Sequence, residues 1–185
     1  MLDAFWSWLG ALPPANASFI GTLTGSFLGL LAIILGALFN ANLNRRRDDR
    51  LREADRIALA STLYAEFNGV YRSLVENAEH ITVPPLDPES SFAVPQPMMA
   101  TMPGLLPKLG LLSTDTIRRV LDAYILTEHY LDDLMIAGGT LRQNRPAGRQ
   151  MVDFGAKHAK IVAAINKSRA NLMKEAMAAL APYLR

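Results

Sequence analysis

The chain has no cysteine among its 185 residues. It therefore has no disulfide, no thiolate metal site, no thiol nucleophile and no cysteine-ligated iron–sulfur cluster. It also has little net charge, because 19 Lys and Arg residues against 17 Asp and Glu residues leave +2 at pH 7. A balance so close to zero gives no reason to expect a nucleic acid as partner.

The sequence also lacks the short motifs that mark common catalytic and nucleotide-binding sites. No G-x-x-x-x-G-K-[ST], G-x-G-x-x-G, G-x-S-x-G or H-E-x-x-H is present. None of the histidines, which are His80, His129 and His158, has a glutamate three residues before it. The E-x-x-H pairs of di-iron bundles are therefore missing. We predict a protein that is not an enzyme and that uses no cofactor and no metal.

What the sequence does have is a long stretch without formal charge, between Asp3 and Arg45. Within it, residues 19–39 read FIGTLTGSFLGLLAIILGALF. At about 1.5 Å rise per residue, a helix of this length spans the ~30 Å hydrocarbon core of a bilayer. A cleaved signal peptide would need a basic N-terminal region and a shorter apolar core. We therefore predict a transmembrane helix over residues 19–39.

Basic residues flank this segment on one side only. Six arginines follow it within residues 45–56, and no Lys or Arg precedes it. The positive-inside rule then places the C-terminal part in the cytoplasm and residues 1–18 outside. Pro13 and Pro14 are expected to separate a short external interfacial segment, which includes Trp8, from the span. The predicted protein crosses the membrane once, with its N-terminus outside.

The first arginines of this cluster fall where lipid headgroups are expected. They are Arg45, Arg46, Arg47 and Arg50. An arginine near an anionic membrane surface contributes about 1 kcal/mol to binding. Asp48 and Asp49 are interspersed among them, so a solvated collar of mixed charge is the other interpretation, and the two are compatible.

Small residues recur on one face of the predicted span. Gly21, Gly25 and Gly29 are four residues apart, and Gly36 roughly continues the stripe. Such spacing lets two membrane helices approach closely, which predicts a face for self-association or for docking a partner. Glycine is also common in membrane helices in general, which leaves an unoccupied face as the alternative.

Residues 40–80 continue the helical pattern without a proline. Their apolar residues recur at three- and four-residue spacing, which is typical of one buried helix face: Ala60, Leu63, Tyr64, Phe67, Tyr71, Leu74 and Ala78. We predict that the span continues into a long juxtamembrane helix.

Residues 81–112 interrupt this pattern. Seven of the chain's 11 prolines lie between Thr82 and Pro107. This density predicts a loop without regular helix or strand. A loop of this length is unusual in a compact domain, so it is either a linker that returns the chain or a binding segment.

Residues 113–185 predict a helical hairpin, with helices from about Ser113 to Ala137 and from about Arg149 to Leu180. The expected inward face of the second helix is Phe154, Ile161, Ile165, Leu172, Ala176 and Leu180. The predicted fold class is all-α. One transmembrane helix continues into a long cytoplasmic helix, which packs as a three-helix bundle with the two C-terminal helices.

One acidic residue conflicts with this pattern. Glu128 falls in the apolar stripe of the first hairpin helix, and His158 lies on the inward face of the second. We predict a buried polar pair of these two residues, with Arg72 as an alternative partner of Glu128. His129 and Asp133, one turn apart, would then form a surface pair. A shared metal or proton is the alternative interpretation.

Part of this region is similar to a stretch that recurs in uncharacterised bacterial inner-membrane proteins. It reads Pro107-Lys-Leu-Gly-Leu-Leu-Ser-Thr-Asp and leads into Val120-Leu-Asp-Ala-Tyr124 and Glu128-His-Tyr130. Those proteins also carry one N-terminal span, an Arg/Asp/Glu-rich helix and a helical cytoplasmic part. The resemblance implies a bacterial inner membrane. It supplies no catalytic residues, because that family has no established activity.

These features predict a membrane-anchored interaction or scaffold protein that self-associates or is an accessory subunit of a larger membrane complex. The implied partners are anionic lipid, a second copy or another membrane protein. A small oligomeric channel or holin-like permeabiliser is the alternative, although the span offers few polar side chains to line water. An enzyme at the inner leaflet that uses Glu128 and a histidine is the third possibility.

Overall fold

The computed structural model describes residues 7–8, 10–11, 13–82, 87, 90–142 and 150–184. The chain divides into two compact units, Met1–Leu51 and Arg52–Arg185. The predictions for residues 1–6 and for Pro84, Pro85 and Pro88 lie outside the described residues.

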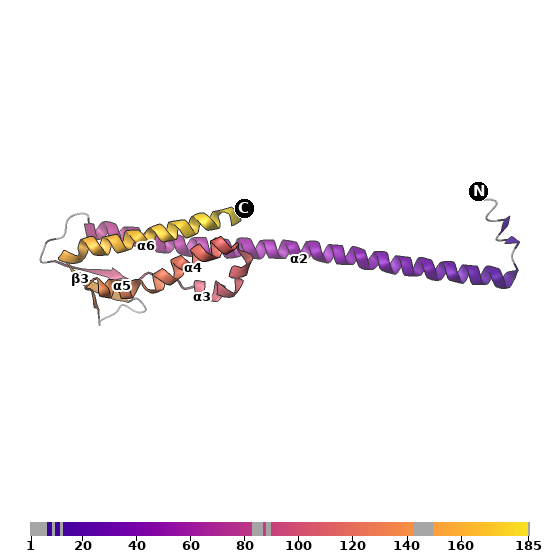
Figure 1. The fold of residues 1–185 in the computed structure, drawn as a ribbon, viewed down its shortest axis with the longest axis horizontal. Helices are drawn as coiled ribbons and strands as arrows, with labels where there is room; N and C mark the ends of the chain where they lie inside the picture. Colours follow the sequence, from indigo (N-terminus) through magenta and orange to yellow (C-terminus); the bar gives the residue numbers. More distant parts are fainter. Residues whose placement is uncertain are drawn as a thin grey trace. The chain divides into compact units, whose positions relative to one another are not determined.

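One helix, α2, runs from Pro14 to Thr82 (Figure 1). The predicted continuation of the span into a long helix is confirmed. The helix begins at the second residue of the proline pair, Pro14. Proline is favoured at the first helical position, because the N–H that it lacks would have no intrahelical partner there. In the first unit, every residue of the predicted span 19–39 is exposed except Ile20, which is half-buried.

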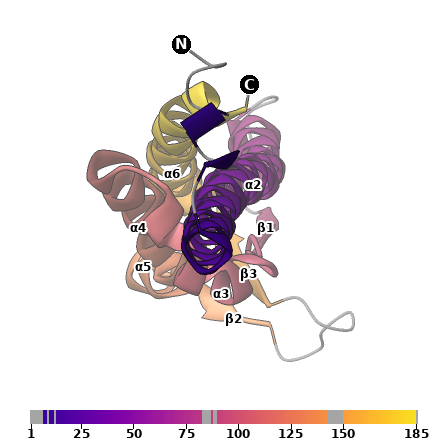
Figure 2. The same ribbon diagram turned by 90° about the vertical axis from the view of Figure 1, so that its right-hand side faces the viewer.

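The second unit has one hydrophobic core, to which the last part of α2 contributes Leu63, Phe67 and Leu74. Against it pack α4 (Thr114–Glu128), α5 (Tyr130–Ile136) and α6 (Ala159–Leu180). Figures 1 and 2 show α6 alongside both α2 and α4 in this unit. The predicted all-α fold, in which the long N-terminal helix packs against C-terminal helices, is confirmed.

The beginning of α4 is fixed by Ser113, which caps the helix. The Ser113 hydroxyl accepts a hydrogen bond from the backbone N–H of Thr116 (3.4 Å). The backbone N–H of Ser113 in turn donates to the phenol oxygen of Tyr183 (3.1 Å). Tyr183 follows α6 in a short 3₁₀ turn, η3 (Ala181–Tyr183). The first residues of α4 are therefore tied to the end of α6.

A small antiparallel sheet lies where a loop and a helix are predicted. Its strands are β1 (Ser91–Pro95), β2 (Thr140–Leu141) and β3 (Met151–Gly155), in the order β1-β3-β2. Val94 is paired with Val152, and both side chains are buried. Phe92 is paired with Phe154, with ring centroids 5.5 Å apart. These cross-strand contacts stabilise strands that neither segment would form alone.

The prediction of a loop without regular structure over residues 81–112 is therefore wrong. Besides β1, this segment contains α3 (Met102–Leu105) and the 3₁₀ helix η1 (Leu106–Leu111). A proline stands among the first residues of each helix, where proline is tolerated. Met102 and Leu109 are buried, which anchors the segment to the core.

The two C-terminal helices differ from their predicted bounds. The second predicted helix, residues 113–137, is broken at His129 into α4 and α5. The third begins at Ala159 rather than near Arg149, because residues 151–155 form β3; Arg149 itself is outside the described residues. A 3₁₀ turn, η2 (Ala156–His158), connects β3 to α6.

The buried face of α6 is also rotated relative to the predicted face. Ile161, predicted to point inward, is 51% exposed, whereas Val162, Asn166 and Met173 are fully buried. A shift by one residue corresponds to a rotation of about 100° around the helix. Ala176 and Leu180 are buried as predicted.

Gly139 provides a test of the packing between α5 and the sheet. A Cβ at this position would lie 2.3 Å from Cγ1 of Val152 and 2.9 Å from the carbonyl oxygen of Leu134. We expect Gly139→Ala to lower the free energy of unfolding by about 1–3 kcal/mol through overpacking. Gly69→Ala is the matched control, because a Cβ there meets no atom within 4 Å. Urea unfolding of the full chain in mild detergent, followed by circular dichroism, measures the stability of both variants. Equal unfolding midpoints would contradict the close packing around Gly139.

Candidate functional site

The apolar part of α2 forms an extended exposed surface in the first unit. Its most apolar window has a mean hydropathy of 2.1 and no buried residue, so the helix is long and apolar enough to cross a membrane. The large side chains are well exposed, with Phe19 at 68% and Ile33 at 71%. Burial of such side chains away from water is favourable by about 1.5–3 kcal/mol each. This surface therefore needs an apolar environment.

The four glycines predicted to form an interface lie on this exposed helix. A Cβ added at Gly21, Gly25, Gly29 or Gly36 would meet no atom within 4 Å. The backbone is therefore open at each glycine to a close approach by another helix, as the sequence predicts. Whether another helix occupies this face stays a prediction.

Polar side chains in the span are few, and one of them is engaged within the helix. The hydroxyl of Thr22 donates to the carbonyl oxygen of Ser18 (2.9 Å). Such a bond satisfies the hydroxyl without water. The Thr22 hydroxyl therefore needs no hydrogen-bond partner outside the helix.

The arginines predicted to meet lipid headgroups are exposed. Arg45, Arg46, Arg47 and Arg50 lie on a part of α2 where every side chain is exposed. The ion pair found among them joins Nε of Arg47 to the carboxylate of Asp48 (3.8 Å). The guanidinium groups are thus available to anionic groups outside the chain.

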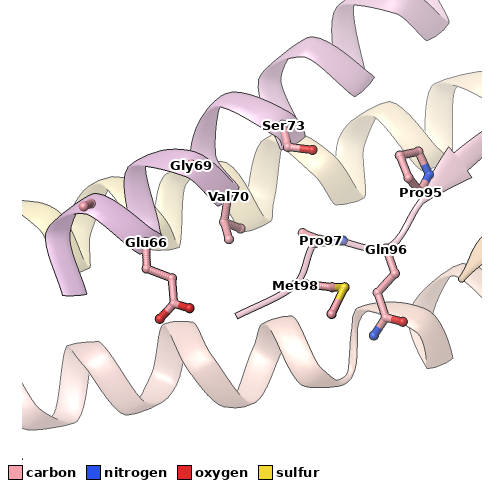
Figure 3. A pocket seen from close by; sticks show the side chains of 9 residues that line it. Glu66, Gly69, Val70, Ser73, Pro95, Gln96, Pro97 and Met98 are labelled. Carbon is pink, nitrogen blue, oxygen red and sulfur yellow. The ribbon is translucent and has the colours of Figure 1, made fainter. Parts of the chain in front are cut away.

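In the second unit, a groove of about 330 Å³ lies between α2 and the residues that follow β1 (Figure 3). Its α2 side includes Glu66 and Gly69, and its other wall includes Pro97 and Met98. One carboxylate oxygen of Glu66 accepts a hydrogen bond from the backbone N–H of Thr101 (2.7 Å). The Glu66 side chain therefore holds the Pro95–Thr101 segment against α2.

The chemistry of this groove is limited. Among its lining residues, Glu66 is the one charged side chain and Ser73 offers the one hydroxyl. No histidine or lysine lines it to activate that hydroxyl. Within the described part of the chain, no three His, Asp or Glu side chains are arranged to hold a metal ion. The interaction that the groove shows is the structural one between the Glu66 carboxylate and the backbone of Thr101.

The buried polar pair of the second unit is Tyr130 and Asn166, which the sequence does not predict to be paired. The hydroxyl of Tyr130 donates to Oδ1 of Asn166 (2.6 Å), and both residues are fully buried. Burial raises the pKa of the Tyr130 phenol well above its usual value, so this phenol remains a donor at physiological pH. A second contact is the ion pair between Arg169 and Asp133. These residues lie three positions after Asn166 and Tyr130, respectively. These contacts fix α5 against α6.

The predicted Glu128–His158 pair is not formed. Glu128 is exposed at the end of α4, while His158 is half-buried next to the ring of Phe154, with centroids 6.1 Å apart. No hydrogen bond or ion pair joins these two described residues, and none joins Glu128 to Arg72. The reason is the break at His129, after which the chain turns so that Tyr130, rather than Glu128, faces α6.

The predicted surface pair of His129 and Asp133 is also wrong. His129 instead contacts Asp132, with Nδ1 3.4 Å from the carboxylate. Asp133 is already engaged by Arg169. The Tyr130–Asn166 pair does have a signal in the sequence. Asn166 is a polar residue on the same helix face as the apolar residues Val162, Ala170 and Met173.

Comparison with family models, with curated proteins and with solved structures finds no match to this chain. The fold and the geometry of the exposed surfaces therefore carry the functional argument.

The Tyr130–Asn166 pair can be tested by removal of its donor. We expect Tyr130→Phe to lower the free energy of unfolding by about 1–3 kcal/mol, because Oδ1 of Asn166 is left buried without a donor. Tyr124→Phe is the control, since the Tyr124 hydroxyl has no hydrogen-bond partner among the described residues, and its effect is expected to be small. Urea unfolding of the full chain in mild detergent distinguishes the two; similar losses would contradict a specific role of the bond.

Proposed function

We propose that the protein is a membrane-anchored interaction protein that self-associates or serves as an accessory subunit of a larger membrane complex. The observation that carries this proposal is α2 itself. An exposed apolar segment long enough to cross a bilayer belongs to the same helix that supplies core residues to a folded unit. A helix satisfies its own backbone hydrogen bonds, which a chain in hydrocarbon requires.

The proposed topology is a single pass with the N-terminus outside and residues 52–185 in the cytoplasm. Its support is the arginine cluster, which follows the span and has no counterpart before it. The sequence resemblance supports a bacterial inner membrane as the compartment. In this arrangement Arg45, Arg46, Arg47 and Arg50 contact anionic headgroups.

An interaction role is favoured over catalysis by the state of the polar groups in the second unit. Tyr130, Asn166, Asp133 and Arg169 are paired with one another in the interior or at its edge. Glu128, on which the enzyme alternative rests, is exposed and does not contact His158. What the protein offers to other molecules is its span and the outer faces of its helices.

The mass of the purified complex tests this proposal. We expect the tagged protein, extracted from its own membranes in mild detergent, to run either as a multiple of 20.3 kDa or with a stoichiometric membrane partner. A monomer of 20.3 kDa with nothing bound would contradict an interaction role.

The glycine face is tested in the same experiment. Gly25→Leu should lower the multimeric or partner-bound fraction several-fold, because it blocks the close approach of helices. Thr24→Leu adds bulk about 100° away on the same helix and is the matched control. Membrane insertion should be unchanged in both variants. An unchanged mass for Gly25→Leu would exclude this face from the assembly.

A further inference from the structure

The solvent-facing side of α6 carries a straight row of lysines. Lys160, Lys167 and Lys174 follow one another at seven-residue intervals, and all three are exposed. Seven residues fall about 20° short of two full turns and rise about 10 Å, so the three side chains leave the helix on one side. The helix is continuous from Ala159 to Leu180, so the row is not interrupted.

None of these three lysines has an ionic partner within the described part of the chain. The other two charged residues of α6 are both engaged. Arg169 pairs with Asp133, and Glu175 contacts Arg119 (3.7 Å). The row therefore presents uncompensated positive charge to whatever lies outside the chain.

Short uncharged side chains accompany the row on one side. Ala164, Asn171 and Ala178 are exposed, and each follows one of the lysines by four residues. Four residues correspond to a rotation of about 40°, so these side chains lie next to the lysines. The distance between two packed helices depends on the side chains at their contact. Short side chains along the row therefore let another helix come close to α6.

The spacing of the lysines determines which partner geometry fits. Carboxylates seven residues apart on another helix recur at the same interval of about 10 Å and rotate around it by the same small angle. Two such helices stay in register when they cross at a shallow angle, which is a common mode of helix packing. In an extended strand about 10 Å corresponds to three residues, and side chains three residues apart point to opposite faces. A strand therefore cannot offer a carboxylate to each lysine in turn.

Other anionic surfaces match this face less well. It has no aromatic ring on which the bases of a single-stranded nucleic acid could stack. A helix that binds a membrane surface buries an apolar face in it. The apolar face of α6 is already in the core through residues such as Val162 and Met173. Ile161 is the one large apolar side chain that is exposed on this helix.

We propose that the lysine row of α6 docks a helix of a partner protein that carries Asp or Glu at seven-residue intervals. The inference rests on the proposed interaction role and names the chemistry of the partner. Each lysine then meets one carboxylate. Both directions of the partner helix satisfy this match, because an evenly spaced row has the same spacing in either direction.

Exposed ion pairs are individually weak, so the row selects the partner rather than holding it alone. A partner anchored in the same membrane is present at a high effective concentration, which supplies the remaining affinity. Added salt screens exposed charges and should weaken the selection.

Disulfide tethering detects a contact this weak, because the chain has no cysteine of its own. The full chain with Asn171→Cys, in non-ionic detergent, is equilibrated in a glutathione buffer with an alanine-rich helical peptide. The peptide has three glutamates at seven-residue intervals and one cysteine between two of them. We expect several-fold more mixed disulfide than with a control peptide whose glutamates are five residues apart and so point around the helix. Asn68→Cys, at an exposed position of α2, corrects for the thiol reactivity of each peptide and should show no preference.

A charge swap then tests whether the lysines direct the contact. Lys167→Glu in the Asn171→Cys chain should lower the yield of mixed disulfide several-fold. A peptide with lysine in place of its middle glutamate should restore it. Lys108→Glu makes the same charge change at an exposed lysine of η1 and should have little effect.

Equal yields with the two peptides would overturn the inference, and so would a yield that Lys167→Glu leaves unchanged. Displacement of the peptide by a single-stranded oligonucleotide or by mixed micelles of phosphatidylglycerol, at equal concentration of negative charge, would assign the row to that anion and overturn it as well.

The mass of the complex purified from its own membranes separates this inference from the proposed function. If the chain runs as a multimer or with a partner but shows no preference between the peptides, this contact is wrong and the interaction role stands. If the chain runs as a monomer with nothing bound, the proposed function fails, and the inference that rests on it fails too.

Discussion

The backbone hydrogen bonding of one helix is the constraint on which the other features depend. Peptide groups in hydrocarbon have no water to bond, so a segment that crosses a bilayer alone has to be helical. In α2 the series of intrahelical backbone hydrogen bonds continues from Pro14 to Thr82 without interruption. The same helix therefore presents an exposed apolar surface at residues 19–39 and buried side chains such as Leu63 and Phe67 further along. One continuous helix therefore carries both the segment that is long and apolar enough to cross a membrane and residues of the folded core.

The helical part of the fold could be predicted because its signals are local. The uncharged run, the proline pair at its start and the spacing from Ala60 to Ala78 specify α2 from neighbouring residues alone. The sheet could not be predicted in this way. β1 and β3 are five-residue segments far apart in the chain, and pairs such as Val94 with Val152 form only after the helices bring them together. Short apolar runs are compatible with either helix or strand until such a partner is known.

The buried polar pair could not be predicted from local signals either. An uninterrupted helix over residues 113–137 would place Glu128 in the apolar stripe, and this assumption produced the wrong pair with His158. The break at His129 changes the helical phase, so that Tyr130 reaches Asn166 and Glu128 stays in water. The exposed glycines and arginines of α2 were found from the sequence, because their placement depends only on helix periodicity.

The central claim is that residues 19–39 lie in a bilayer while the second unit lies on one side of it. Single cysteines in this cysteine-free chain, probed in sealed inverted membrane vesicles with a membrane-impermeant maleimide, test it most directly. The account predicts that a cysteine in place of Phe27 is protected until detergent is added. A cysteine in place of Asn68 should be labelled in inverted vesicles and protected in right-side-out ones. Equal labelling of both positions in intact vesicles would contradict the account.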